Sequence, residues 1–317
     1  MDISSSDSFT KTMEISSNSL GNGSENQSEQ NQPENIRTLN DYLSIEILGA
    51  GAQGSVEKVR RKRDGQIVAI KVITSKNIEK AKMEVEILEE ISRPQCNPFL
   101  ACYLGHFYDF ENGKFVIEME YIPGKSLLKF IRETSSDTAE SRSSVPARAS
   151  SSKVYRYLLL ILRDLVTGLE LVHSKGIIHS DIKPDNIIIT PNLVPKLVDF
   201  GLGCKASICN GKECCDKELV GTPQFVAPET ITRHVRYFAS DIWSLGVTLY
   251  YCAVNNYPFP FRGLGTPEIL GTIARSEPNK LDTTNELLND ITNRCLIKNP
   301  FDRIFLSEIS EKLKNII

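Results

Sequence analysis

Three short apolar runs lie close together at residues 177–178, 187–189 and 197–198, and polar residues fill the gaps between them. Runs of Ile, Leu and Val as short as these, bounded by proline and polar residues, are typical of buried strands. The polar residues between the runs are therefore expected in loops on stiff supports. Proteins usually place their chemistry in such loops.

The polar residues in these loops are of the types that phosphate chemistry needs. Asp181 supplies a carboxylate that can accept a hydroxyl proton, and Lys183 supplies an ammonium that can neutralise phosphate. Asn186 and Asp199 supply an amide oxygen and a second carboxylate, which are ligands suited to Mg²⁺. Together the four residues predict phosphoryl transfer.

The order of these residues resembles the catalytic core of eukaryotic protein kinases. The loop reads H-x-D-x-K-x-x-N from His179 to Asn186, and D-F-G follows at residues 199–201. Two polar surface turns are the alternative, but two such strings at this spacing seldom arise by chance. The resemblance implies an α+β, two-lobed protein-kinase fold, with a small antiparallel-sheet lobe carrying one main helix and a larger, mainly helical lobe. It also implies that His179 and Phe200 are packing residues.

A glycine-rich string precedes this core by more than a hundred residues. Gly49, Gly51 and Gly54 form G-x-G-x-x-G, which by itself also fits dinucleotide-binding folds. After Gly54 the sequence predicts a strand, a hairpin turn at residues 64–65 and a further strand, with no crossover helix between them. This order favours the kinase loop that covers nucleotide phosphates, and an ordinary glycine-rich hairpin is the alternative.

Lys71 ends a Val-Ala-Ile-Lys string that is similar to a kinase strand, and its role there requires a partner carboxylate. The helix predicted over residues 77–91 offers Glu84, which shares the apolar stripe with Ile87, whereas Glu86 lies on the charged side. A carboxylate on an apolar stripe needs a cation, so we expect Glu84 to pair with Lys71. A glutamate at the margin of the stripe is the alternative.

The resemblance implies a site for ATP and Mg²⁺, with the metal on Asn186 and Asp199. Met119 would border the adenine, and the backbones of Glu120 and Ile122 would hydrogen-bond its edge. The full set of implied ATP-binding residues is Leu48, Gly49, Gly51, Gly54, Val56, Ala69, Lys71, Met119, Glu120, Ile122 and Ile188.

Residues 202–226 resemble an activation loop, with Ser207 and Thr222 as its hydroxyl residues. By the same resemblance Thr222 hydrogen-bonds near Asp181 and Lys183, in a stretch that implies a polypeptide acceptor rather than a small molecule. The resemblance also implies Ser/Thr acceptors from Lys183 and a preference for serine from Leu202. The set of catalytic residues that the resemblance implies is Asp181, Lys183, Lys71 and Glu84.

Position 180 departs from the family pattern, because most kinases have arginine between the histidine and the aspartate. Ser180 cannot pair with a phosphate through two parallel hydrogen bonds, so the resemblance does not extend to activation by phosphorylation of the activation loop.

Three further residues have expected structural roles. Glu229 is expected to pair with Arg303, and Asp241 to brace the catalytic loop or cap a helix.

Four of the eight cysteines fall in the predicted activation loop, at Cys204, Cys209, Cys214 and Cys215. They could bind Zn²⁺ or form a redox switch, but they lack the usual CxxC spacing, and we expect a reduced, mobile loop.

The start of the chain shows no signal peptide, and no run reaches the length of a membrane span. We therefore expect intracellular thiols and a cytoplasmic location, with the nucleus as the alternative.

Composition divides the chain into a tail and a domain. Residues 1–41 are rich in Ser, Asn, Gln and Glu, and we expect them to be disordered. The kinase domain is predicted at 42–317, with a small lobe at 42–120, a hinge at 120–125 and a large lobe at 126–317. A low-complexity insert is expected within the large lobe, at residues 134–153.

We predict a Ser/Thr protein kinase that transfers the γ-phosphate of MgATP to a protein hydroxyl, with serine preferred. The alternative is a catalytically weak kinase-fold docking or scaffold protein, although such proteins usually lack Lys71, Asp181 or Asp199. A net charge of −3 argues against a nucleic-acid partner. We expect a monomer without a membrane partner. It is expected to act on a protein substrate and to bind a regulatory protein.

Overall fold

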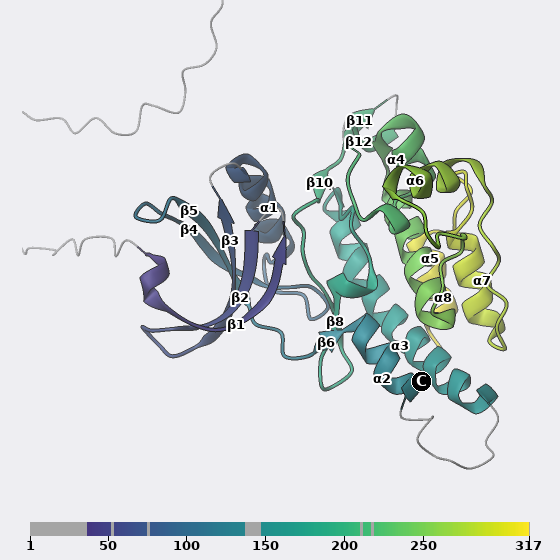
Figure 1. Ribbon diagram of the computed structural model, residues 1–317, viewed down its shortest axis with the longest axis horizontal. Coiled ribbons are helices and arrows are strands. Elements are labelled where there is room, and N and C mark those ends of the chain that lie inside the picture. Colours follow the sequence, from purple (N-terminus) through teal and green to yellow (C-terminus); the bar gives the residue numbers. More distant parts are fainter. Residues whose placement is uncertain are drawn as a thin grey trace, which may run out of the picture. The chain divides into compact units, whose positions relative to one another are not determined.

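The computed structural model describes residues 37–51, 54–74, 77–136, 147–209, 212–216 and 219–316, and it has two lobes (Figure 1). The smaller lobe holds a five-stranded antiparallel sheet in the order β1-β2-β3-β5-β4. Its strands are β1 (Tyr42–Gly51), β2 (Gly54–Arg61), β3 (Ile67–Thr74), β4 (Tyr103–Asp109) and β5 (Lys114–Glu120). The predicted two-lobed α+β kinase fold is confirmed.

Helix α1 (Ile78–Ile91) is the main helix of the small lobe, and it follows the predicted pattern. Its buried face carries Val85, Leu88 and Ile91 at helical spacing, together with the carboxylate of Glu84. This face packs against β3, β4 and β5. The helix thereby presents an acidic side chain to the sheet.

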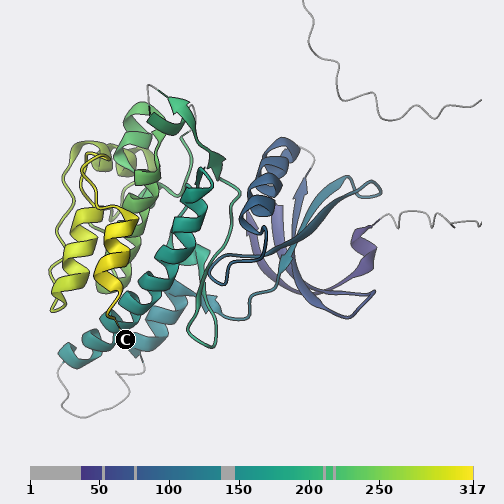
Figure 2. The same ribbon diagram turned by 180° about the vertical axis from the view of Figure 1, so that it is seen from behind.

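The larger lobe is mainly helical. Its helices are α2 (Leu127–Ser136), α3 (Ala147–Ser174), α4 (Pro228–Arg233), α5 (Phe238–Val254), α6 (Thr266–Arg275), α7 (Glu286–Cys295) and α8 (Leu306–Leu313). Helix α3 packs against α5 and α8, as the view from behind shows (Figure 2). Trp243, Leu245 and Val247 of α5 are completely buried, so α5 forms the centre of the lobe.

The first two apolar runs form the predicted short strands, and the third run overlaps a strand only at Leu197. The strands are β7 (Ile177–Ile178), β8 (Ile187–Ile189) and β9 (Pro195–Leu197), and Val198 follows β9. Strand β8 lies between β9 and β6 (Lys125–Ser126), and β7 pairs with β10 (Cys204–Lys205). The short helix η3 (Pro184–Asn186) joins the catalytic loop to β8. The polar loop residues are thus fixed at both ends by buried backbone.

The predicted activation loop contains more regular structure than the sequence suggested. It holds β11 (Ser207–Cys209), β12 (Lys212–Asp216) and the short helix η4 (Pro223–Phe225). Strand β12 also pairs with β13 (Val235–Arg236), which follows α4. The segment is therefore attached to the lobe by a small three-stranded sheet.

The folded domain begins earlier than the predicted boundary at residue 42. Helix η1 (Leu39–Asp41) lies beside the sheet, where the backbone N–H of Leu39 donates to Asp109 at 2.9 Å. Arg37 contacts Glu118 at 3.3 Å, and these two contacts join residues 37–41 to the small lobe. The rest of the predicted tail, residues 1–36, lies outside the described residues.

Helices α2 and α3 extend into the predicted low-complexity insert. Helix α2 ends at Ser136 and α3 begins at Ala147, so both ends of the segment 134–153 are helical. The middle of that segment, residues 137–146, lies outside the described residues.

Two disulfides contradict the prediction of reduced thiols. Cys96 is joined to Cys102, and Cys204 is joined to Cys215. Cys96 and Cys102 lie in the irregular segment before β4, whereas Cys204 lies on β10 and Cys215 on β12, and the cysteine spacing alone does not reveal either pairing. The predicted cytoplasmic location rested partly on free thiols and stays a prediction.

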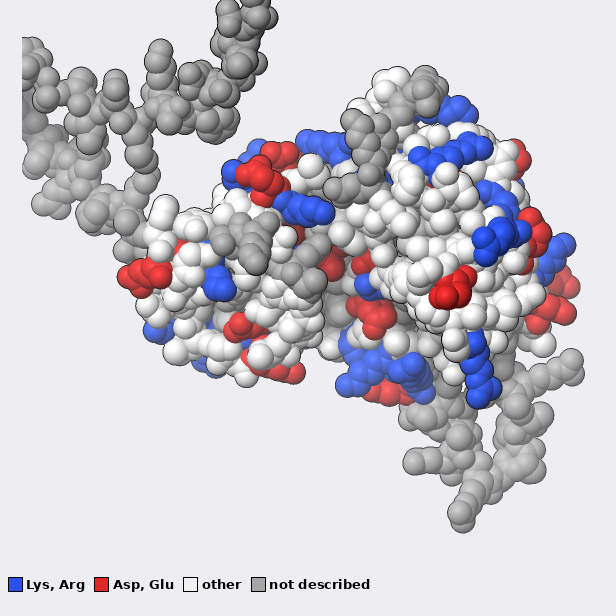
Figure 3. Space-filling view, turned by 45° about the horizontal axis from the view of Figure 1, so that its top comes forward, with Lys and Arg blue, Asp and Glu red and all other residues white. Residues whose placement is uncertain are grey.

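The surface in Figure 3 carries acidic and basic residues in a mixed pattern. Among the described residues, no helix is both long and apolar enough to cross a membrane.

Candidate active site

The ammonium of Lys71 lies between two carboxylates. Its Nζ donates to both carboxylate oxygens of Glu84 at 2.8 Å and to Oδ1 of Asp199 at 2.9 Å. Strand β3 places Lys71 in the middle of the sheet, opposite Ile117 of β5, and α1 presents Glu84 from the side. The predicted pairing of Lys71 with Glu84 is present, and it also reaches the large lobe.

The electrostatics of this trio follow from burial and contact. Burial alone would lower the pKa of Lys71, but the carboxylates of Glu84 and Asp199 outweigh it and raise that pKa. Burial raises the pKa of Glu84, and Lys71 opposes that effect. For Asp199, Lys71 overcomes the effect of burial and the pKa is lowered. Lys71 is therefore a charged ammonium, and Asp199 is a carboxylate at neutral pH.

The carboxylate of Asp181 is the centre of the catalytic loop. Its Oδ1 accepts hydrogen bonds from the hydroxyl of Thr222 at 2.7 Å and from the Thr222 backbone N–H at 3.0 Å. Lys183 donates to Oδ2 of Asp181 at 2.6 Å and to the Thr222 hydroxyl at 2.8 Å. The predicted meeting of Thr222 with Asp181 and Lys183 is thus present, and Asp181 already accepts a hydroxyl group.

Asn186 and Asp199 are held beside this carboxylate. The amide nitrogen of Asn186 donates to the carbonyl of Asp181 at 2.9 Å and to its Oδ2 at 3.0 Å, so the amide oxygen points the other way. Asp199 has a positive φ of 62°, and 46% of its side-chain surface is exposed. Its second oxygen therefore has room for another ligand.

Asp241 braces the backbone that carries Asp181. Its carboxylate accepts the backbone N–H groups of His179 and Ser180, each at 2.9 Å. The bracing contact expected for Asp241 is therefore present. The structure adds His173, whose Nε2 lies 2.9 Å from the same carboxylate. Sequence reasoning missed this contact, because two residues 68 positions apart leave no local pattern.

His179 and Phe200 pack against each other, with ring centroids 4.7 Å apart. Both residues are buried, and Nε2 of His179 lies 3.1 Å from the carbonyl of Val198. These contacts join the catalytic loop to the segment that carries Asp199, as the predicted packing role requires.

Most of the residues that the sequence assigned to the nucleotide lie along β1, β2, β3 and β5, and Ile122 and Ile188 lie elsewhere. Gly54 has a φ of 145°, and a Cβ there would lie 2.0 Å from the carbonyl oxygen of Val72, so only glycine fits. Ala69 pairs with Met119 across the sheet, and Gly49 pairs with Val56. Leu48 lies on β1 and is 44% exposed.

At the hinge, Lys196 donates to the side chain of Glu120 at 2.7 Å, and the backbone N–H of Glu120 donates to the carbonyl oxygen of Cys102 at 2.9 Å. Ile122 follows in the irregular segment after β5. Ile188 lies on β8, opposite Ser126 of β6. The assigned residues therefore come from both lobes.

The predicted structural pair of Glu229 and Arg303 is present and buried. Two hydrogen bonds of 2.7 Å join Nη1 and Nη2 of Arg303 to the two carboxylate oxygens. Ser240 also donates to this carboxylate at 2.7 Å. Such a pair fixes α4 against the C-terminal part of the large lobe.

Arg236 is a residue that sequence reasoning missed. Its Nη1 lies 2.9 Å from the hydroxyl of Ser180 and 3.0 Å from the carbonyl oxygen of Leu202. The guanidinium therefore meets the catalytic loop at the position where the family resemblance expected an arginine side chain. The sequence holds no signal for this contact, because Arg236 belongs to no motif.

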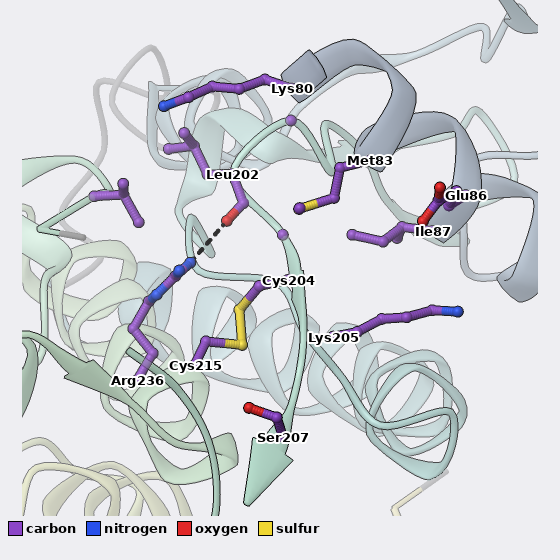
Figure 4. Close-up of a pocket in the computed structure, with 13 residues that line it drawn as sticks. Lys80, Met83, Glu86, Ile87, Leu202, Cys204, Lys205, Ser207, Cys215 and Arg236 are labelled. Atoms are coloured by element: carbon purple, nitrogen blue, oxygen red, sulfur yellow. Dashed lines mark hydrogen bonds between the residues drawn. A yellow bond between two sulfur atoms is a disulfide. The ribbon is translucent and has the colours of Figure 1, made fainter. Parts of the chain in front are cut away.

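The activation segment is cross-linked rather than reduced and mobile. The disulfide from Cys204 to Cys215 lines a cavity of about 450 Å³ beside α1, together with Ser207 and Arg236 (Figure 4). Among the described side chains, no three His, Cys, Asp or Glu residues gather as a metal site. The predicted Zn²⁺ alternative has no support there, and the side chain of Cys209 is not described.

Comparison with known proteins agrees with this geometry. The protein kinase domain family matches residues 42–313. The chain belongs to the protein kinase family. Serine/threonine-protein kinase ppk11 of Schizosaccharomyces pombe is 27% identical over 276 residues, which are 85% of this chain and 80% of that protein.

Two plant kinases show similar agreement. Serine/threonine-protein kinase GRIK2 of Arabidopsis thaliana is 29% identical, across 87% of this chain and 65% of that protein. Mitogen-activated protein kinase kinase 2 of the same plant is 30% identical, across 86% of this chain and 72% of its own length. The chain whose structure is described above is therefore a serine/threonine protein kinase. Its domain uses ATP, and its substrates are proteins.

Proposed function

We propose that this kinase transfers the γ-phosphate of MgATP to a serine hydroxyl of a protein, in preference to threonine. Lys71, fixed by Glu84, holds the α- and β-phosphates, and Gly49, Gly51 and Gly54 cover them. Asp181 orients the acceptor hydroxyl, and Lys183 steadies the γ-phosphate.

The observation that carries this proposal is the contact of Lys71 with Asp199. An ammonium from the small lobe and a carboxylate from the large lobe meet at 2.9 Å, so the two lobes share one charged centre. A cation at that point attracts phosphate oxygens, and a half-exposed carboxylate beside it attracts a metal. This pairing of charges suits a nucleotide triphosphate with its metal ion.

The donor set fits Mg²⁺. Asn186 offers an amide oxygen, because its amide nitrogen is already used by Asp181. Asp199 offers a carboxylate with a lowered pKa, and hard oxygen ligands of this kind suit Mg²⁺. When bound, the metal would neutralise charge that develops on the phosphate oxygens. Asn186 and Asp199 are the residues that would hold it.

The contacts of Asp181 support its role toward the acceptor. Its Oδ1 accepts the Thr222 hydroxyl, so a substrate hydroxyl of the same chemistry can be accepted there. Asn186 and Lys183 both donate to Oδ2, which holds the carboxylate in one orientation. Asp181 is thereby prepared to orient the hydroxyl and to take its proton as the phosphate transfers.

Phosphorylation of a peptide library with either Ser or Thr at the acceptor position tests the proposal. We expect Mg²⁺-dependent transfer from radiolabelled ATP, with Ser several-fold preferred. Asp199→Asn should require much more Mg²⁺ for the same rate. The matched control is Asp185→Asn, because Asp185 is exposed on the same loop. A normal Mg²⁺ requirement in Asp199→Asn would remove the assigned metal ligand, and equal use of Thr would remove the serine preference.

A further inference from the structure

We propose that Arg236 is a positioning residue for phosphate transfer, which acts by tying the catalytic loop to the segment that follows Asp199. One nitrogen of its guanidinium lies within 3.0 Å of both the Ser180 hydroxyl and the Leu202 carbonyl oxygen. Ser180 directly precedes Asp181, and Leu202 is three residues beyond Asp199. A single buried cation therefore holds the chain beside each of the two acidic residues of the site. The inference rests on the roles proposed above for Asp181 and Asp199.

The two tethered segments need such support because both have unusual backbone conformations. Ser180 has a φ of 71° and Asp199 a φ of 62°, a region that residues other than glycine seldom occupy. Such conformations persist only where the surroundings enforce them. Asp241 holds the backbone N–H of Ser180, and Arg236 holds its side chain, so Ser180 is fixed from two directions.

The position of Arg236 is itself fixed by the activation segment. In the pairing of β13 with β12, Arg236 lies opposite Cys215, whose disulfide partner is Cys204. Cys204 in turn lies opposite Ile178 of β7, the strand that leads into the catalytic loop. These links form a closed ring. It runs from β7 to β10, through the disulfide to β12, on to β13, and back to the catalytic loop through the bond of Arg236 to Ser180.

Figure 4 shows how these groups lie. The Arg236 side chain runs along one side of the cavity toward the Leu202 carbonyl, and the Cys204–Cys215 disulfide lies next to it. Arg236 is 7% exposed, so its hydrogen bonds are formed away from bulk water. A charged donor in such a place holds its acceptors more firmly than a neutral donor does.

Steady-state kinetics of the full chain with MgATP and a peptide acceptor test the inference. Arg236→Met should lower kcat about 10- to 100-fold, because two charge-assisted hydrogen bonds are lost. The KM for ATP should change less than about threefold, because the hydrogen bonds of Arg236 go to Ser180 and Leu202, which are not among the assigned nucleotide residues. A loss confined to kcat is the result expected when the catalytic groups are misaligned but ATP still binds. The matched control is Arg233→Met on α4, because Arg233 is exposed and kcat should stay at the wild-type value.

A double-mutant cycle separates positioning from general stability. Ser180→Ala removes one of the two acceptors and should lower kcat by a smaller factor than Arg236→Met does. In the Ser180→Ala/Arg236→Met variant the loss should equal that of Arg236→Met alone, because the shared hydrogen bond is already absent. Fully multiplied losses in the double variant would overturn the inference.

The inference stays testable if Arg236→Met fails to fold. Arg236→Lys keeps the positive charge, but a lysine amino group can reach fewer acceptors than the guanidinium does. We therefore expect its kcat to be lower than that of the wild type and higher than that of the Ser180→Ala/Arg236→Lys double variant. Folded Arg236→Lys and Ser180→Ala variants with kcat within twofold of wild type would overturn the inference.

An Asp181→Asn variant as active as the wild type would instead overturn the proposed function. An inactive Asp181→Asn beside a fully active Arg236→Met would overturn the positioning role alone.

Discussion

The ammonium of Lys71 lies 2.9 Å from the carboxylate of Asp199, although the two residues are 128 positions apart in the chain. Lys71 belongs to the sheet of the small lobe, and Asp199 follows β9 of the large lobe. A contact between opposite charges at this distance is sensitive to any change in lobe arrangement. It is therefore the clearest sign that the two lobes adopt an arrangement suited to the reaction.

Lys71→Met should lower the rate of phosphate transfer by about 100-fold or more, because the cation assigned to the phosphates is removed. The domain should remain folded, since Glu84 can become protonated where burial already raises its pKa. Phosphotransfer rates and circular dichroism check both expectations. Lys82→Met serves as the control, because Lys82 forms an exposed pair with Glu79. Wild-type turnover in Lys71→Met would contradict the assignment.

Glu229→Gln should lower the free energy of unfolding by about 3–5 kcal/mol, because the buried guanidinium of Arg303 loses its counter-charge. Urea denaturation measures this change. The comparison variant is Glu308→Gln, which breaks the more exposed pair with Arg294 and should change stability little. Equal stability of the two variants would show that the Glu229 pair is not structural.

Stability at acid pH should depend on Asp241. Burial alone would raise the pKa of Asp241, but hydrogen bonds from His173 and the backbone of His179 lower it. Its folded pKa therefore lies below the unfolded value of about 3.9, so its contribution is complete above about pH 4 and is lost as the pH falls through the folded pKa. Asp241→Asn should be less stable at pH 7 and should lose less further stability between pH 5 and pH 3. Parallel pH profiles for the two proteins, from urea denaturation, would contradict this linkage.

Removal of the Cys204–Cys215 disulfide should loosen the activation segment. The two cysteines are 11 positions apart, and opening a loop of that size lowers the free energy of unfolding by about 2–3 kcal/mol. Hydrogen exchange of a Cys204→Ser/Cys215→Ser variant should therefore quicken in residues 204–216. The matched variant Cys96→Ser/Cys102→Ser lacks the other disulfide and should leave exchange there unchanged. Unchanged exchange in both variants would show that β12 and β13 hold the segment without the disulfide.

The sequence predicted those parts of the site that depend on local pattern. The inward position of Glu84 followed from helical periodicity, and the supports of the catalytic loop followed from short apolar runs. The pair of Glu229 and Arg303 followed from the family resemblance and was found where expected.

The parts that the sequence did not reveal depend on contacts between distant positions. His173 meets Asp241 across 68 positions, and Arg236 meets Ser180 across 56. Neither contact leaves periodicity or spacing that could be read beforehand. The disulfides were missed for a related reason, because cysteine count and spacing do not determine pairing.

The central claim is that Asp181 accepts the substrate hydroxyl in a site completed by Lys71 and Asp199. Single-turnover transfer from radiolabelled ATP to an acceptor peptide, measured for wild type and Asp181→Asn at equal ATP occupancy, tests it directly. We expect Asp181→Asn to bind ATP as the wild type does and to transfer phosphate at least about 100-fold more slowly. Transfer by Asp181→Asn at the wild-type rate would contradict the account.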